Sequence, residues 1–249
     1  HTMQRAALLL LLILLAFSPT PGLRAQGTFQ QDTLPTGSGD LTITFIGHGT
    51  LMFSHGETVV HVDPVSREAD YTHLPDADLI LVTHEHGDHL DPEAIALLQK
   101  DDTRVVASPS CEGRIEGVRI MENGEEADLS GFHVEAVPAY NRVHMRSEGT
   151  PYHPQGNGNG YIITFEDLRV YVAGDTENIP EMKALQDIDV AFLPMNLPYT
   201  MTPEMVADAA RAFRPRILYP YHFGDTDPSR LVDLLGNEPE IEVRVREMG

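Results

Sequence analysis

The stretch from Thr83 to Asp91, Thr-His-Glu-His-Gly-Asp-His-Leu-Asp, constrains this chain more than any other part of it. It follows the apolar run 77–82, whose length and aliphatic content are typical of a buried strand. A buried strand has little structural reason to end in three imidazoles and a carboxylate. These side chains suit a divalent first-row metal ion, zinc above all. A solvated, histidine-rich turn is the alternative.

The spacing within this stretch predicts how the ligands are presented. His84 and His86 occupy alternate positions, so an extended backbone points both side chains the same way. Gly87 then lets the backbone turn before Asp88 and His89. One short loop could therefore offer two pairs of ligands to two adjacent metal ions.

The beginning of the chain has the layout of a secretory signal peptide. Arg5 precedes the apolar block 6–17, which is short for a membrane span, and a Ser-Pro-Thr-Pro-Gly stretch follows. We predict that residues 1–25 are a signal peptide cleaved near Ala25, which makes the protein secreted or periplasmic without a stable membrane anchor. An uncleaved anchor is the alternative. His1-Thr2 before the methionine indicates a cloning remnant.

The composition of the chain limits the kinds of partner it can bind. The formal net charge of −21 disfavours nucleic acid and anionic lipid surfaces, so we expect a small-molecule substrate. The oligomeric state is left open. The lone Cys111 cannot form an intramolecular disulfide, and its surroundings resemble no cysteine-enzyme motif. A hydrophobic content of 41% is enough for a real core.

The order of predicted elements places most strands early and helices later. Residues 26–39 are predicted to be a flexible lead-in and residues 40–249 one catalytic domain. Strands are predicted at 41–46, 50–54, 58–62, 79–83, 104–107, 118–121, 132–137, 161–165, 169–173, 189–193, 217–221 and 240–246. Helices are predicted at 94–99 (with Asp91 as N-cap and Pro92 in the first turn), 179–185, 203–213 and 228–235, and 138–160 is expected to be irregular.

Further polar residues follow predicted strands, where a rigid sheet presents functional groups. Asp175 lies in a Gly-Asp-Thr turn after 169–173, and His222 follows 217–221. His153 lies in the irregular stretch. Three more residues at strand ends are candidates for contact with substrate: His48, Asn196 and Tyr199.

Taken together, the His-x-His-x-Asp-His stretch, the Gly-Asp-Thr turn and the late Tyr221-His222 resemble the metallo-β-lactamase superfamily, from about residue 41 to 246. The resemblance implies an α+β fold, an αββα four-layer sandwich in which two mixed β-sheets pack face to face with helices on the outer faces. The order of predicted strands and helices agrees with it.

The resemblance also implies a ligand set. His84 and His86 would hold one metal ion with a third histidine, whereas Asp88, His89 and His222 would hold a second. Asp175 would bridge the two ions, which would be zinc, with manganese or iron as alternatives. A metal-bridging hydroxide would be the nucleophile, and Asp88 would also orient it as the catalytic carboxylate.

The third ligand of the first ion stays open between three residues after strand 132–137: Asn141, His144 and His153. Imidazole is a better zinc ligand than a carboxamide, which disfavours Asn141. His153 is favoured over His144 because the glycines that follow it allow the backbone to approach a metal centre closely.

Secondary motifs are similar to the ascorbate-6-phosphate lactonase-like branch: Ile-Gly-His-Gly-Thr at 46–50, His-Val-Asp-Pro at 61–64, Pro-Ala-Tyr-Asn at 138–141 and Tyr-Thr-Met-Thr at 199–202. N-acylethanolamine-phospholipid phosphodiesterases share the Gly-His beginning. We therefore predict an exported binuclear hydrolase acting on an ester, lactone, amide or phosphodiester. The alternatives are a non-hydrolytic metal-binding protein, an iron-dependent redox enzyme or a weak β-lactamase.

The remaining histidines have other predicted roles. His61 and Asp63 are expected to support the site from behind, with the Asp63 carboxylate fixing the tautomer of a ligand imidazole. His55, His73 and His133 are expected at the surface.

Overall fold

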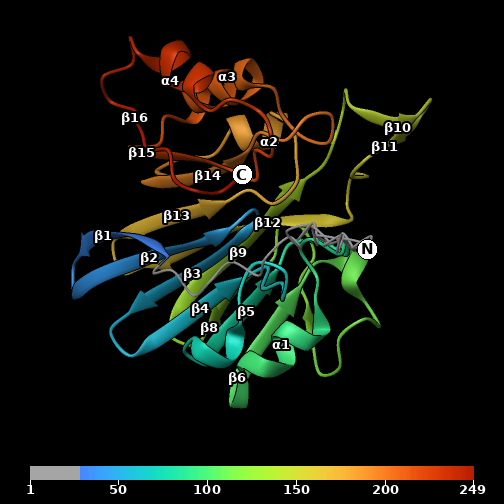
Figure 1. The fold of residues 1–249 in the computed structure, drawn as a ribbon, viewed down its shortest axis with the longest axis vertical. Coiled ribbons are helices and arrows are strands. Elements are labelled where there is room, and N and C mark those ends of the chain that lie inside the picture. Colours follow the sequence, from blue (N-terminus) through green and yellow to red (C-terminus); the bar gives the residue numbers. More distant parts are fainter. Residues whose placement is uncertain (1–28) are drawn as a thin grey trace, which may run out of the picture.

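The structure, a computed structural model, describes residues 29–249, so the predicted signal peptide lies outside the described residues. Two seven-stranded mixed sheets pack face to face, and helices cover both outer faces (Figure 1). This arrangement confirms the predicted αββα sandwich. Within residues 29–249, no helix has both the length and the apolar character needed to cross a membrane.

The first sheet has the order β1-β2-β3-β4-β5-β6-β7 and the second the order β16-β15-β14-β13-β12-β9-β8. The strands of the first are β1 Gln30–Thr36, β2 Gly39–Gly47, β3 Thr50–His55, β4 Thr58–Val62, β5 Ala77–Val82, β6 Gln99–Ala107 and β7 Arg119–Ile120. Those of the second are β8 Glu126–Leu129, β9 Phe132–Ala139, β12 Gly158–Phe165, β13 Leu168–Val172, β14 Val190–Pro194, β15 Ile217–Tyr221 and β16 Glu242–Val243. A separate hairpin is formed by β10 Met145–Ser147 and β11 Thr150–Pro151, and the helices are α1 Pro92–Leu98, α2 Pro180–Lys183, α3 Pro203–Phe213 and α4 Ser229–Leu235.

Both sheets change from antiparallel to parallel pairing along their width. Strands β1 to β4 pair antiparallel and β4 to β7 parallel, whereas β8, β9, β12 and β13 pair antiparallel and β13 to β16 parallel. Within each sheet, this pairing directs the ends of several strands to one edge: β2, β4 and β5 in the first, β9, β13, β14 and β15 in the second. Loops leaving these ends carry the candidate site.

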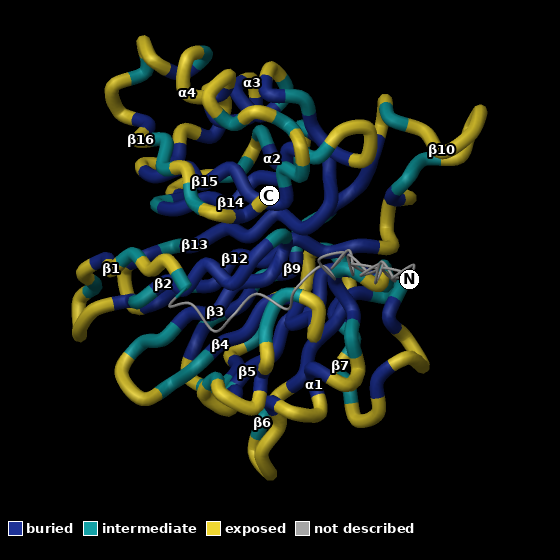
Figure 2. The backbone as a smooth tube through the Cα atoms, in the orientation of Figure 1, coloured by how far each residue is buried: buried dark blue, intermediate teal, exposed yellow. Residues whose placement is uncertain are grey.

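The core consists of three buried layers. The central layer lies between the sheets, where the Phe192 and Tyr219 rings stack with centroids 4.9 Å apart against Phe45. Outer layers pack α1 on the first sheet and α2, α3 and α4 on the second. Figure 2 shows the inner strands of both sheets as largely buried and the β10–β11 hairpin as largely exposed. Truncating one of the central rings to alanine would cost about 3–5 kcal/mol.

Local sequence signals fix the helix ends. The Asp91 carboxylate accepts hydrogen bonds from the Glu93 and Ala94 amides, and Pro92 occupies the first turn, as predicted. Helix α3 has the predicted bounds, with Thr202 as N-cap and Arg214 in the left-handed conformation at its C-terminal end.

The prediction of a flexible lead-in was wrong for residues 30–36, which form strand β1. This strand is polar, but it pairs with β2 and its Asp32 carboxylate accepts hydrogen bonds from Tyr219 and Arg246. Local composition could not reveal partners so distant in sequence. The predicted strand 240–246 is shorter in the structure, where it spans Glu242–Val243, and the side chains of Arg244 and Arg246 pair with Asp32.

Smaller differences concern element lengths. Helix α2 spans only part of the predicted 179–185, and β8 and the β10–β11 hairpin were not predicted. The hairpin lies within the stretch expected to be irregular. Its residues are exposed or half-buried, so no apolar alternation marks it.

Candidate metal centre

The predicted ligands converge at the edge where the carboxyl ends of the strands meet. Strand β5 delivers the loop after Thr83, where the His89 and Leu90 amides both donate to the His86 carbonyl and close a tight turn. Strands β13 and β15 deliver Asp175 and His222 from the second sheet. The structure therefore brings all seven predicted metal ligands together: His84, His86, Asp88, His89, His153, Asp175 and His222.

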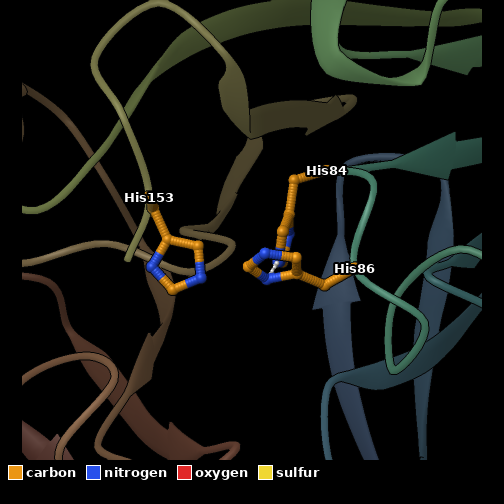
Figure 3. A group of neighbouring side chains, drawn as sticks. All are labelled: His84, His86 and His153. Atoms are coloured by element: carbon orange, nitrogen blue, oxygen red, sulfur yellow. Dashed lines mark hydrogen bonds between the residues drawn. The ribbon is translucent and has the colours of Figure 1, made fainter. Parts of the chain in front are cut away.

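The first group consists of His84, His86 and His153, whose ligand atoms lie within 4.8 Å of one another (Figure 3). His84 Nε2 and His86 Nδ1 are 3.1 Å apart, and the His153 ring stands perpendicular to that of His84 at 5.1 Å. Of the three candidates for the third position, His153 is the one in the group. The His144 ring instead pairs with Glu177, and Asn141 accepts a hydrogen bond from His153.

Asp175 lies between this group and the next. Its Oδ2 is 3.2 Å from His153 Nε2 and 3.8 Å from His84 Nε2, whereas its Oδ1 is 3.4 Å from His89 Nε2 and 3.6 Å from His222 Nε2. Gly174, with a φ of +64°, makes this placement possible, because a Cβ there would lie 2.7 Å from the Asn159 carbonyl oxygen. The carboxylate thus divides its two oxygens between two sets of imidazoles.

The predicted second group consists of Asp88, His89 and His222. In the structure the ligand atoms of Asp88 and His222 lie within 4.8 Å of one another and of His48, whereas that of His89 forms such a group with those of His84 and Asp175. Asp88 Oδ2 lies 3.5 Å from His222 Nε2 and 3.9 Å from His89 Nε2, as the resemblance implied. His48, predicted only as a substrate contact, also has its Nε2 3.2 Å from this oxygen, and its ring lies 3.8 Å from that of His222. His48 therefore borders both the second group and the open side of the site.

A buried carboxylate orients His89 from behind, as predicted for Asp63. His89 Nδ1 donates to Asp63 Oδ2 at 2.7 Å, while the amide and hydroxyl of Thr83 donate to the two Asp63 oxygens at 2.7 and 2.6 Å. Because a carboxylate only accepts, the neutral His89 ring must carry its proton on Nδ1 and present the lone pair of Nε2 to the site. His61, by contrast, is buried and hydrogen-bonds the Pro75 carbonyl, with no contact to the cluster.

Three non-glycine residues at this edge have left-handed backbones: His48, Asp63 and His222, with φ of 52°, 47° and 45°. The His222 amide donates to the His48 carbonyl at 3.0 Å, which links two of them. Such conformations are uncommon outside glycine and concentrate where function requires a side chain to point in a set direction.

The site is electrostatically coupled. Burial acts to raise the pKa of Asp175, but the neighbouring His222, His89 and His153 outweigh it and hold that pKa well below its usual range. Burial also opposes ionisation of Asp88, yet hydrogen bonds from His222 and His48 hold its pKa low. Burial lowers the pKa of His84. For His89, burial is outweighed by Asp175, Asp63 and Asp88, which raise its pKa to about 9.

The donor set fits divalent cations. His89 Nε2, Asp175 Oδ1 and His222 Nε2 are buried and have no hydrogen-bond partner among the described residues. When His89 is neutral, two lone pairs face each other across the 3.4 Å between His89 Nε2 and Asp175 Oδ1. Two ligands of one tetrahedral zinc ion, with bonds of about 2.0 Å, lie about 3.3 Å apart. A cation between these atoms would satisfy them, whereas leaving them unpaired is costly.

A cavity of ≈ 970 Å³ opens beside the cluster. The three predicted substrate contacts, His48, Asn196 and Tyr199, all line it. Arg146 and Tyr152 line it as well, with the guanidinium of Arg146 5.8 Å from the centroid of the Tyr152 ring. Sequence reasoning missed these two because they belong to the unpredicted β10–β11 hairpin and the chain just after it.

Sequence reasoning also missed Glu177, a fully buried carboxylate two residues after Asp175. It accepts hydrogen bonds from the Arg142, Val143 and His144 amides. An acidic residue so close to a Gly-Asp-Thr turn was the available signal. Of the three histidines predicted at the surface, His73 is exposed, whereas His55 and His133 are half-buried.

A histidine- and aspartate-lined centre at the edge of an αββα sandwich defines a metal-dependent hydrolase of the metallo-β-lactamase fold. Residues 42–222 match the family described as the beta-lactamase superfamily domain, and the chain belongs to that superfamily. A UPF0173 metal-dependent hydrolase of Thermococcus kodakarensis is 30% identical over 219 residues, which cover 81% of this chain and 95% of the relative.

Solved structures agree with this family. The chain is 52% identical to a Parabacteroides distasonis protein that carries the provisional name of metal-dependent hydrolase, with a TM-score of 0.84 over 89% of this chain and 100% of the other. It is also similar to Igni18, a metallo hydrolase of Ignicoccus hospitalis, at 25% identity and a TM-score of 0.67, over 84% of this chain and 96% of the other. Similarity extends along nearly the full length of each of these proteins.

Proposed function

We propose that the chain is a two-metal hydrolase that cleaves an ester, lactone, amide or phosphodiester. The observation that carries this proposal is the position of Asp175, whose two oxygens face two different groups of imidazoles. A storage or scaffold protein has no need of a carboxylate shared between two cations. Bridged pairs of cations are instead typical of enzymes that stabilise both the attacking and the leaving oxygen.

In this proposal His84, His86 and His153 hold one cation, and Asp88, His89 and His222 hold the other. Two divalent cations bound there would supply an activated water molecule and polarise the scissile carbonyl or phosphoryl oxygen. Zinc suits these nitrogen and oxygen ligands, and manganese or iron is tolerated by the same set.

The chain's own residues then orient the reactants. Asp88 is the more exposed of the two site carboxylates and lies on the cavity side, where its free oxygen can accept a proton from a water molecule. His48, whose Nε2 lies 3.2 Å from Asp88 Oδ2, can donate to Asp88 or to the substrate. The half-exposed Tyr199 hydroxyl can donate to an oxygen on which negative charge develops.

The substrate branch is a finer part of the proposal. The Gly-His-Gly turn at 47–49 and the Pro-Ala-Tyr-Asn segment at 138–141 support the ascorbate-6-phosphate lactonase-like branch, since both contribute to the site. We therefore expect activity toward a lactone or ester in preference to a β-lactam. A panel of chromogenic lactones, esters, phosphodiesters and β-lactams ranks these substrate classes directly.

The test of the two-metal proposal is removal and return of the metal. Protein stripped of metal with a chelator should lose its hydrolytic activity and regain it at two equivalents of zinc. The bound zinc is measured by elemental analysis in the same samples as the activity. His86→Ala and Asp88→Ala should each abolish turnover while leaving the thermal unfolding of the stripped protein near that of the wild type. His73→Ala, an exposed histidine paired with Asp70, is the matched control and should keep full activity.

Outcomes that count against the proposal are specific. Purified protein without bound metal, or unchanged rates in His86→Ala or Asp88→Ala, would remove its basis. Tightly bound iron combined with no turnover on any substrate of the panel would favour a redox enzyme on the same scaffold.

We propose export separately, on the apolar block after Arg5 and the Ser-Pro-Thr-Pro-Gly stretch that follows it. Expression of the full sequence in a bacterium with two membranes, followed by fractionation and mass determination, should find a shortened protein in the periplasm. A full-length protein in the cytosol would overturn this proposal without affecting the enzymatic one.

A further inference from the structure

Asn141 occupies an unusual position, because one carboxamide joins three parts of the site. Its Oδ1 lies 2.5 Å from His153 Nδ1, and its Nδ2 is 3.1 Å from Glu177 Oε1 and 2.8 Å from the Tyr199 carbonyl oxygen. Its own amide also donates to the His153 carbonyl at 2.8 Å. Asn141 therefore contacts His153 through both its backbone and its side chain.

The partners of Asn141 determine which way its amide group points. The Glu177 carboxylate and the Tyr199 carbonyl can only accept hydrogen bonds, so both must face the NH₂ group. The oxygen of Asn141 is then left for His153. Because that oxygen can only accept, Nδ1 of His153 must carry the proton, and a neutral His153 ring presents the lone pair of Nε2 to Asp175 and His84.

Glu177 is anchored as firmly as Asn141. Besides Asn141, it accepts hydrogen bonds from the amides of Arg142, Val143 and His144 at 2.7, 2.8 and 2.6 Å, and only 1% of its surface is exposed. The Glu177 amide in turn donates to the Tyr140 carbonyl. The carboxylate thus holds the segment 141–144 in one conformation beside Asp175.

His153 needs such support more than the other imidazoles of its group. His84 and His86 leave directly from the end of β5, whereas His153 follows the exposed β10–β11 hairpin. His89, in the second group, is oriented by the Asp63 carboxylate. The Thr83 hydroxyl also lies 3.0 Å from His84 Nδ1. His153 differs from both His84 and His89 because a neutral amide fixes it, and a buried carboxylate orients that amide.

We propose that Asn141 and Glu177 are positioning residues that fix the tautomer and direction of His153, and thereby set the zinc affinity of the His84–His86–His153 group. This inference rests on the proposed two-metal function. Partners of this kind typically contribute 10- to 100-fold to metal affinity. The effect should fall on one of the two ions, because Asn141 contacts no side chain of the Asp88–His89–His222 group.

The experiment measures zinc binding by competition with chelators of graded affinity, with stoichiometry from elemental analysis. Asn141→Ala should retain its second ion with wild-type affinity and bind the first about 10- to 100-fold more weakly. Asn178→Ala is the matched control, because Asn178 directly follows Glu177 in the chain but its side chain donates to Asp208. It should bind both ions as the wild type does.

A double variant separates positioning from a general structural role. If Asn141 acts through His153, replacing it in a His153→Ala background should cause no further loss of zinc affinity. Equal losses in both backgrounds would show that Asn141 supports the fold and would overturn the inference. Wild-type affinity in Asn141→Ala would overturn it as well.

Glu177→Gln provides a second, isosteric test, which keeps the inference falsifiable if Asn141→Ala fails to fold. Glutamine at this position either turns its NH₂ group toward Asn141, which forces the Asn141 amide to flip, or turns it toward the backbone amides. Both arrangements should selectively weaken the binding of zinc to the His84–His86–His153 group, and unchanged zinc affinity would contradict the proposal. A wild type that binds no zinc would instead refute the two-metal function itself.

Discussion

Asp63→Asn is the most informative single substitution at this centre, because it changes one oxygen into an NH₂ group without changing the shape of the residue. The Asp63 backbone has a φ of 47°, a conformation that asparagine tolerates as well as aspartate. No backbone penalty is therefore expected. The Thr83 amide, which can only donate, keeps the remaining oxygen at Oδ1.

The new NH₂ group must then face Thr83 Oγ and His89 Nδ1, which lie 2.6 and 2.7 Å from the replaced oxygen. To accept its hydrogen bond, His89 must move its proton to Nε2, where the proton points at Asp175 Oδ1, 3.4 Å away. The ligand lone pair is lost in this tautomer. Loss of such an orienting partner costs about 10- to 100-fold in metal affinity, which corresponds to about 1.4–2.7 kcal/mol.

The assay is zinc competition on the Asp88–His89–His222 group, together with thermal unfolding of the stripped protein. Asp78→Asn is the control, since Asp78 lies at the opposite end of β5 and accepts hydrogen bonds from Val59 and Lys100. Zinc affinity in Asp63→Asn within twofold of the wild type would refute the tautomer argument. A loss of zinc affinity at the His84–His86–His153 group alone would refute the assignment of His89 to the other cation.

Three further perturbations follow from the same geometry. Gly49→Ala should weaken zinc binding in the second group, because the added Cβ would lie 2.8 Å from His89 Cε1 and 3.3 Å from His222 Cδ2; zinc competition tests this against an unchanged His84–His86–His153 group. Burial lowers the pKa of His61 in the folded protein to about 4 from 6.5, so only the unfolded chain gains a proton between these two values. The free energy of unfolding therefore decreases as the pH is lowered from 6.5 to about 4, by about 3 kcal/mol in all. His61→Phe removes this dependence and should flatten the acid side of the stability curve measured by urea unfolding. Removal of zinc should lower the melting temperature, because each occupied site stabilises the native state by about 2.7 kcal/mol at a free zinc concentration of 100 times its dissociation constant. A melting temperature independent of zinc would contradict native-state binding.

Local sequence patterns predicted those parts of the site that depend on a single strand and the loop after it. The apolar run before Thr83 placed four ligands at one strand end, and the Gly-Asp-Thr turn placed Asp175. The Asp63 carboxylate was predicted to orient a ligand imidazole, and it does contact His89. These predictions needed only the fact that strand ends present functional groups at one edge.

The remainder depends on contacts between distant segments. The choice of His153 over His144 was open because the buried Glu177 decides it, by holding His144 away from the cluster. The cavity wall was missed because the β10–β11 hairpin carries no apolar alternation. Likewise β1 was missed because it pairs with β2 and because its Asp32 contacts Arg246, at the opposite end of the described chain.

The division of ligands between the sheets makes metal binding a property of the whole sandwich. The first sheet supplies His84, His86, Asp88 and His89, and the second supplies Asp175, His222 and, through its β9–β12 connection, His153. Hydrogen bonds join the sheets directly beneath this edge, from the Tyr161 hydroxyl to the Val82 carbonyl and from the Asn159 amide to the Thr83 carbonyl, each at 2.9 Å. The distances between ligand atoms within each group must hold to a few tenths of an ångström. Any substitution that shifts one sheet against the other should therefore weaken the binding of both cations together. Loss of a single orienting partner should weaken the binding of only one cation. The pattern of zinc loss therefore distinguishes a disturbed fold from a single misoriented ligand.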